Sequence, residues 1–215
     1  MKKLLYITVS SKPENMSVSR QAGRAFLKSF QEDYPGYELE ELDLATYDLP
    51  EPNYRYFKGW VELVSGAEYD ALPEPDQEAV DRMNSLCTQF LAADITVIAA
   101  PMWSMSFPFR LKQYLDCIML NNRLIRLTPT EATGLLNDKV RKMVYIQSSG
   151  GIYPKIFDGK FNMGIKYFHD LFLHLGVKDF YKILIQGTDM VDVGKEKALQ
   201  AAQDDFDDVL DKICG

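Results

Sequence analysis

Hydroxyl side chains gather in the segment that follows the first apolar run of the chain. Residues 4–9 read LLYITV, and residues 10–19 read SSKPENMSVS. Ser17 or Ser19 could cap a helix that starts there, because a serine oxygen accepts a hydrogen bond from a free backbone amide. Such amides and the helix dipole also attract anions. The segment therefore indicates either an ordinary helix cap or a site for a single phosphate group.

This phosphate site would have to form without the usual glycine-rich loops. Neither the lysine-bearing GxxxxGK[ST] loop of nucleotide hydrolases nor the GxGxxG motif occurs in the sequence. Hydroxyl groups and backbone amides would hold the phosphate instead. This arrangement suits the single phosphate of FMN.

A second segment joins an apolar strand to a loop of aromatic and sulfur-containing residues. Residues 95–100 read ITVIAA, which is typical of a strand buried on both faces in a parallel sheet. Pro101 ends the run, residues 102–107 read MWSMSF, and Pro108 suits the first turn of a helix. Open α/β sheets bind ligands at the carboxyl ends of their strands. We therefore expect residues 102–107 to hold a planar, partly polar ring, such as a flavin.

A third segment, residues 148–153 (SSGGIY), follows the predicted strand at residues 139–147. Two adjacent glycines allow a positive φ and a close approach of the backbone to a ligand. A wide turn would have the same composition. The position of the segment after a buried strand, opposite the hydroxyl-rich loop, favours the ligand interpretation.

Residues outside these loops show no catalytic or metal-binding pattern. His169 and His174 are five residues apart, which is not the one-turn spacing of a metal pair, and no metal is expected. Cys87 and Cys117 lie in apolar helical patterns and are expected to be buried, unreactive thiols. The GxSxG elbow of hydrolases is absent. The catalytic side chain is thus unknown, with Tyr153 as the one candidate, and a cofactor is expected to carry the reaction.

Alternating strands and helices must bring the three loops together. Strands are predicted at residues 4–9, 37–44, 95–100, 139–147 and 180–186. Helices are predicted after residue 17, at 78–92, from 108, at 161–175 and at 195–213. On the first helix, the predicted inner face consists of Ala22, Ala25, Phe26 and Phe30. This alternation predicts the α/β class, with a parallel sheet covered by helices on both faces.

The length of 215 residues allows one domain with a sizeable core. Prolines and glycines interrupt residues 45–75, within which one helix is predicted at 56–63. We interpret residues 45–75 as an insertion too short to have a core of its own. Its aromatic side chains could form a substrate wall or a dimer surface, or could pack against the body of the domain.

The composition excludes several classes of partner. The chain carries 24 basic and 31 acidic side chains, a net charge of -7, which argues against nucleic acid and against an anionic membrane surface. The amino-terminal apolar run is too short for a signal peptide, and no run reaches membrane-spanning length. A cytoplasmic location is therefore expected.

Taken together, the three loops resemble those of the FMN-dependent NADH:quinone oxidoreductase and azoreductase family. Residues 100–108 (APMWSMSFP) and 111–116 (LKQYLD) are similar to the family pattern APMYNF(N/S)xPxxLKxYxD. Residues 148–153 are similar to (S/A)RGGxY, and the hydroxyl-rich loop is similar to the family's phosphate loop. The resemblance implies a single flavodoxin-like domain over residues 1–215 with the irregular insertion at 45–75. It also implies three layers, a five-stranded parallel sheet in the order 2-1-3-4-5, and a homodimer.

The resemblance further implies that FMN is bound and that NADH or NADPH is the co-substrate. The FMN phosphate would be surrounded by Ser11, Ser17, Val18 and Ser19. The isoalloxazine ring of FMN would be lined by Met102, Trp103, Ser104 and Met105. The pyrimidine side of the ring would be enclosed by Ser148, Ser149, Gly150 and Gly151.

Four of these positions depart from the family pattern. Trp103 replaces a tyrosine, Ser104 an asparagine and Met105 a phenylalanine, and main-chain contacts tolerate such changes. Ser149 replaces an arginine, which removes a positive charge near the flavin. Cofactor affinity, redox potential and substrate choice are all sensitive to that charge.

The resemblance implies an oxidoreductase that transfers two electrons from NAD(P)H to a quinone or azo compound by a ping-pong mechanism. Two alternatives stay open at the level of sequence. One is a flavin-binding electron carrier or redox sensor that acts on a protein partner, since carriers of this fold are typically acidic. The other is a module that has lost its cofactor and binds a partner through its aromatic loop.

Overall fold

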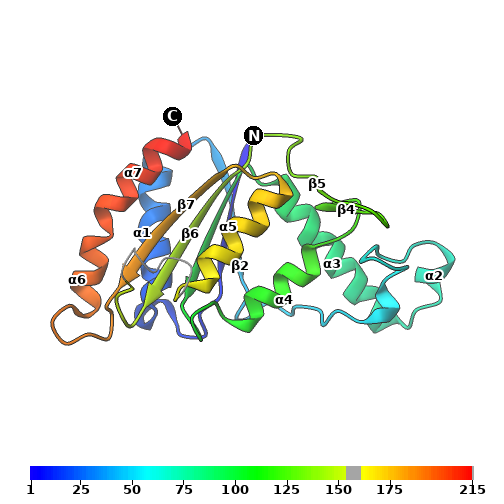
Figure 1. Ribbon diagram of the computed structural model, residues 1–215, viewed down its shortest axis with the longest axis horizontal. Helices are drawn as coiled ribbons and strands as arrows, with labels where there is room; N and C mark the ends of the chain where they lie inside the picture. The colour runs from blue at the N-terminus through cyan, green and yellow to red at the C-terminus, as the bar shows by residue number, and fades with distance from the viewer. Residues whose placement is uncertain (154–160, 215) are drawn as a thin grey trace.

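A five-stranded parallel sheet forms the centre of the computed structural model, which describes residues 1–153 and 161–214 (Figure 1). The strands lie in the order β2-β1-β3-β6-β7. Their bounds are Lys2–Thr8 (β1), Tyr37–Asp43 (β2), Ile95–Pro101 (β3), Lys142–Ser149 (β6) and Asp179–Gln186 (β7). Counted along the sheet alone, this order is 2-1-3-4-5, so the predicted topology is confirmed.

Helices cover both faces of the sheet (Figure 1). One face carries α1 (Val18–Asp33), α6 (Gly194–Ala201) and α7 (Gln203–Cys214). The other carries α3 (Glu74–Ala92), α4 (Phe109–Ile118) and α5 (Met163–Leu175). The closing helix predicted at 195–213 is thus two helices, which meet at Ala202.

The two central strands contribute to both hydrophobic cores. Ile98 and Tyr145 pack with buried side chains of α3, α4 and α5, whereas Val97 and Val144 pack with those of α1, α6 and α7. Every second residue faces the opposite layer, so a strand between two helical layers must be apolar throughout. This explains the uninterrupted apolar runs in the sequence.

Helix α1 approaches the sheet closely at Gly23. A Cβ atom at this position would lie 2.2 Å from the Tyr6 hydroxyl oxygen on β1. Ala22, Phe26 and Phe30 are buried as predicted, but Ala25 is exposed and Leu27 is buried instead. The buried face of the helix is rotated toward Gly23, because only glycine leaves room for the tyrosine beneath it.

The insertion differs from its prediction. The helix predicted at 56–63 is wrong: a 3₁₀ turn, η2 (Tyr54–Tyr56), leads into an antiparallel bridge between Phe57 and Leu63. Gly59, Trp60 and Val61 have φ values of 127°, 42° and 51°, which an α-helix cannot contain.

This insertion packs beside α3 and α4, away from the sheet (Figure 1). The Tyr56 hydroxyl donates to Asp76 of α3 at 3.0 Å, and the Gln113 amide of α4 donates to the Leu49 and Pro50 carbonyls at 3.1 Å each. A four-residue helix, α2 (Ala67–Asp70), follows. The insertion is therefore tied to the outer helices.

A small antiparallel pair, β4 (Ile125–Leu127) and β5 (Ala132–Gly134), lies in the segment predicted to be irregular. Three-residue strands are too short to show a periodicity in the sequence. In the part of the chain that the structure describes, no helix has both the length and the apolar character needed to cross a membrane.

Candidate functional site

A cavity of about 180 Å³ opens at the carboxyl ends of β1, β3 and β6. These strand ends lie at the lower edge of the sheet in Figure 1. Four chain segments form its wall. They contribute Ser10, Ser11, Lys12, Met16, Ser17, Val18, Pro101, Met102, Trp103, Ser148, Ser149, Gly150, Thr188, Asp189 and Lys195. The cavity thus lies where the ends of three parallel strands place their loops, as the general rule for open sheets predicts.

One end of the cavity is the start of α1. A short 3₁₀ turn, η1 (Glu14–Met16), leads to Ser17, whose hydroxyl accepts the Arg20 amide at 3.4 Å and caps the helix. The Ser17 and Ser19 hydroxyl oxygens lie 3.2 Å apart. The first amides of a helix have no partners within the helix, so they point outward as hydrogen-bond donors. Amides and hydroxyls together make this end suited to an oxyanion.

The charged side chains at the cavity favour the same ligand. Lys12 and Lys195 both line it, together with one carboxylate, Asp189. Among the described residues, neither lysine is ion-paired to a carboxylate. The wall therefore carries a net positive charge next to the start of a helix, which favours a phosphate.

The other end of the cavity is the turn after β3. The Trp103 and Ser106 backbones exchange two hydrogen bonds of 3.2 and 2.8 Å. Between them, Ser104 and Met105 have φ values of 47° and 62°. Residues other than glycine adopt this left-handed conformation at a cost, and it is concentrated at ligand sites and switches. The turn leaves Trp103 46% and Met105 37% exposed.

Residues 148–150 form the third wall, and hydrogen bonds join them to a fourth segment that the sequence analysis did not identify. The Thr188 amide and hydroxyl donate to the Ser149 carbonyl at 3.1 and 3.2 Å, and the Asp189 amide donates to the Gly150 carbonyl at 3.1 Å. A Cβ atom on Gly150 would lie 2.5 Å from the Asp189 carboxylate. Glycine at 150 therefore allows the loop after β7 to complete the cavity.

Eight of the twelve predicted cofactor-binding residues line this cavity: Ser11, Ser17, Val18, Met102, Trp103, Ser148, Ser149 and Gly150. Ser19 is fully buried behind Ser17. Ser104, Met105 and Gly151 lie in the same loops without lining the cavity itself. The sequence prediction missed Ser10, Lys12, Met16, Pro101, Thr188, Asp189 and Lys195. Residues 188–189 follow the fifth strand after Gly187, so the carboxyl end of that strand is the signal that could have identified them.

Comparison with known proteins agrees with this geometry. The model of a family described as having a flavodoxin-like fold matches residues 2–210. FMN-dependent NADH:quinone oxidoreductase 1 of Clostridium acetobutylicum is 49% identical over 213 residues, which cover 99% of this chain and 96% of that protein. A Clostridium botulinum protein with the name FMN-dependent NADH:quinone oxidoreductase is 42% identical, covering 99% of this chain and 100% of its own.

This chain belongs to the flavodoxin-like NADH:quinone oxidoreductase family.

Solved structures support the same placement. The FMN-dependent NADH-azoreductase of Bacillus anthracis, determined in complex with FMN, superposes with a TM-score of 0.86 at 28% identity, and the match covers 100% of both chains. The family resemblance and the fold predicted from the sequence are thereby confirmed, and so is the prediction of an oxidoreductase enzyme. The assignment of individual residues to a cofactor stays a prediction.

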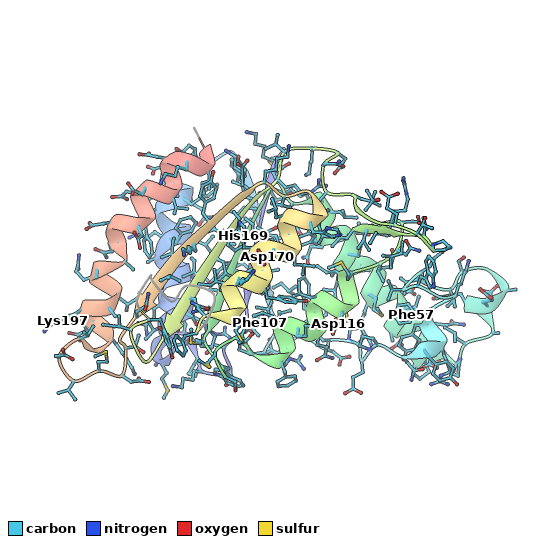
Figure 2. All side chains as sticks on the ribbon, in the orientation of Figure 1. Phe57, Phe107, Asp116, His169, Asp170 and Lys197 are labelled. Carbon is cyan, nitrogen blue, oxygen red and sulfur yellow. The ribbon has the colours of Figure 1, made fainter. Side chains whose placement is uncertain are left out.

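Among the described residues of this oxidoreductase, a histidine–aspartate pair and two cysteines lie away from the cavity. Figure 2 shows Phe107 beside the start of α5, and His169 with Asp170 farther along that helix. The His169 Nδ1 lies 3.1 Å from the Asp170 carboxylate on the exposed surface. Cys87 and Cys117 are buried as predicted, and burial raises the pKa of these thiols to about 11 and about 12. Neither thiol is therefore a nucleophile at neutral pH.

Proposed function

We propose that the chain is an FMN-dependent oxidoreductase that transfers two electrons from NAD(P)H to quinones or azo compounds. One observation carries the proposal: a single cavity joins a helix start rich in hydroxyls and amides to a turn that presents Trp103 and Met105. Relatives that are 49% and 42% identical over nearly the whole chain carry the name FMN-dependent NADH:quinone oxidoreductase.

The residues present fit FMN at its phosphate end. The Ser10, Ser11 and Ser17 side chains, the first amides of α1, and the ammonium groups of Lys12 and Lys195 supply donors and positive charge. Among the described residues that line the cavity, Asp189 is the one acidic side chain to be accommodated. Its place beside Gly150 makes it an acceptor for a hydroxyl-bearing chain such as the ribityl group.

At the ring end, the main chain of residues 102–105 is expected to contact the ring, and the Trp103 side chain to stack with an incoming aromatic group. When bound, FMN would supply the redox chemistry, a two-electron transfer from NAD(P)H to the acceptor in a ping-pong sequence. Ser149 supplies no charge here, since a serine hydroxyl is neutral, and this hydroxyl donates to the Gly151 carbonyl at 2.9 Å. Tyr153 does not line the cavity, although its ring lies 3.9 Å from the position of a Cβ on Gly151.

We also propose that the chain acts as a homodimer in the cytoplasm. Several large apolar side chains near the ring end are exposed. They are Trp103 (46%), Met105 (37%), Phe109 (68%), Met163 (55%) and Tyr167 (40%). Such a group of exposed apolar side chains favours burial against another surface. A second copy would cover it and would enclose the ring end from outside.

The test begins with the purified full chain incubated with FMN and then desalted. We expect a visible flavin spectrum, oxidation of NADH in the presence of a water-soluble quinone or an azo dye, and parallel double-reciprocal plots for the two substrates. Rates with NADPH measure the nucleotide preference, and light scattering measures the assembly. Absence of flavin bands, or flavin binding without NADH turnover, would contradict the proposed activity.

A further inference from the structure

We propose that Arg20 is a positioning residue that orients the Ser10–Ser11 peptide for phosphate binding, with Asp43 holding Arg20 in place. The inference rests on the proposed function, because the phosphate concerned is that of FMN. Nothing in the sequence motifs pointed to either residue.

The side chain of Arg20 joins three elements. It lies in the first turn of α1, and its Nε donates to the Ser10 carbonyl, which follows β1, at 3.1 Å. Nη2 donates to the same carbonyl. Nη1 and Nη2 also donate to the two Asp43 carboxylate oxygens at the end of β2, both at 2.8 Å. The planar guanidinium thus binds a carboxylate with one edge and a carbonyl with another.

Because of the geometry of the peptide bond, the contact of Arg20 with the Ser10 carbonyl also sets the direction of the Ser11 amide. A trans peptide is planar, so the carbonyl of Ser10 and the amide of Ser11 point in opposite directions. With the carbonyl held by Arg20, the Ser11 amide is turned away from Arg20. Ser11 lines the cavity, and its amide donates to no residue that the structure describes. A donor is therefore free where a phosphate would lie.

Rotation of this peptide would reverse the effect. The carbonyl oxygen carries a partial negative charge, and turned toward the cavity it would repel the phosphate oxygens. Arg20 does not line the cavity itself, and its charge is paired with Asp43. It therefore acts through the peptide that it orients, and direct neutralisation of the ligand is left to Lys12 and Lys195.

A second arginine on the same helix provides a matched control. Arg24 lies one turn after Arg20 and donates to both Glu41 carboxylate oxygens on β2, each at 2.8 Å. Both arginines therefore tie α1 to β2 with the same two-pronged geometry. The Arg24 pair is more exposed, at 43% and 45% against 14% and 33% for Arg20 and Asp43. In the loop after β1, Arg24 contacts the Glu14 carboxylate at 3.4 Å, and neither Arg24 nor Glu14 lines the cavity.

The experiment measures dissociation constants of the flavin-free full chain for FMN and for riboflavin, which lacks the phosphate. Because the Ser11 amide would donate to a charged phosphate, which makes a stronger bond than one between neutral groups, we expect Arg20→Gln to weaken FMN binding about tenfold or more. Riboflavin binding should change by less than about twofold, since the bond affected serves only the phosphate. Arg24→Gln should leave both constants unchanged.

Equal losses for FMN and riboflavin in Arg20→Gln would overturn the inference, as would an unchanged FMN constant, or the same loss in Arg24→Gln. If Arg20→Gln does not fold, Asp43→Asn takes its place, because it frees the guanidinium to move while keeping the size of the side chain. It should lower the preference for FMN over riboflavin, and an unchanged preference would likewise overturn the inference. A wild-type chain that binds neither flavin would instead refute the proposed function.

Discussion

The two ends of the cavity are built in opposite ways. At the end formed by the start of α1, which we propose binds the FMN phosphate and call the phosphate end, Ser10, Ser17 and Ser19 are 4%, 3% and 0% exposed. The helix cap and the hydrogen bonds of Arg20 hold their backbone. At the end formed by the turn after β3, which we propose binds the flavin ring and call the ring end, Trp103 and Met105 are exposed on a turn with left-handed residues. The phosphate end is completed by the chain itself, whereas the ring end offers apolar surface for something else to cover.

This difference indicates which end of the cavity is already formed in the protein without a ligand. A buried polar loop must satisfy its own hydrogen bonds during folding, so it is preformed before any ligand arrives. The exposed turn after β3 is held by contacts with α5. Phe107 packs on Phe168, and the Met163 amide donates to the Met105 carbonyl at 2.9 Å. We therefore expect substitutions beneath the ring end to change mainly the stability of the protein. Substitutions at the phosphate end should change both stability and flavin affinity.

The largest effect is expected beneath the ring end. Phe168 is fully buried, and its ring lies 5.0 Å from that of Phe107 and 4.9 Å from that of Tyr145. Phe168→Ala should lower the free energy of unfolding by about 3–5 kcal/mol, measured by urea denaturation. Leu173→Ala on the exposed side of the same helix is the control and should cost less than about 0.5 kcal/mol. Similar losses in both variants would show that the ring end does not depend on this packing.

A smaller loss is expected where the phosphate end rests on the sheet. Gly23→Ala places a Cβ within 2.2 Å of the buried Tyr6 hydroxyl, so α1 must shift. We expect a loss of about 1–3 kcal/mol from overpacking. Addition of Tyr6→Phe should recover part of it, and Gly36→Ala, which has nothing within 4 Å, should be neutral. A neutral Gly23→Ala would mean that α1 tolerates the displacement.

Removal of the helix cap affects both stability and affinity. Ser17→Ala deletes the oxygen that accepts the Arg20 amide and a hydroxyl of the cavity wall. We expect the free energy of unfolding to fall by about 1 kcal/mol, measured by thermal or urea unfolding. Relative to wild type, the affinity for FMN should fall more than the affinity for riboflavin. Thr88→Ala, an exposed hydroxyl on α3, is the control. Unchanged flavin selectivity would leave Ser17 with a capping role alone.

The smallest effect is expected at the left-handed turn and has the opposite sign. Met105→Gly removes the strain of a φ of 62° but makes the unfolded chain more flexible, so stability should rise by no more than about 1 kcal/mol. Met102→Gly, which is not left-handed, should be destabilising. A clear loss of stability in Met105→Gly would show that its side chain contributes more by packing than its backbone costs.

The strands, the main helices and three of the four cavity walls could be predicted because their signals are local. The apolar run at 95–100, the serines at 10–19 and the glycines at 150–151 are each recognisable without knowledge of distant residues. The family resemblance then joined the three loops into one site. The predicted helix at 56–63 failed because apolar spacing does not reveal that Trp60 and Val61 adopt a left-handed turn.

Order along the chain decides the alternation of strands and helices, since side-chain periodicity and turn-forming residues act over a few positions. It also decides which loops emerge at the carboxyl edge of the sheet. Only folding in three dimensions decides that Thr188 and Asp189 bind the 149–150 backbone, that Arg20 and Asp43 meet at Ser10, and that Ser19 is hidden. Each of these contacts depends on how α1, β2 and β7 pack around a shared core, and no pattern of neighbouring residues records that packing.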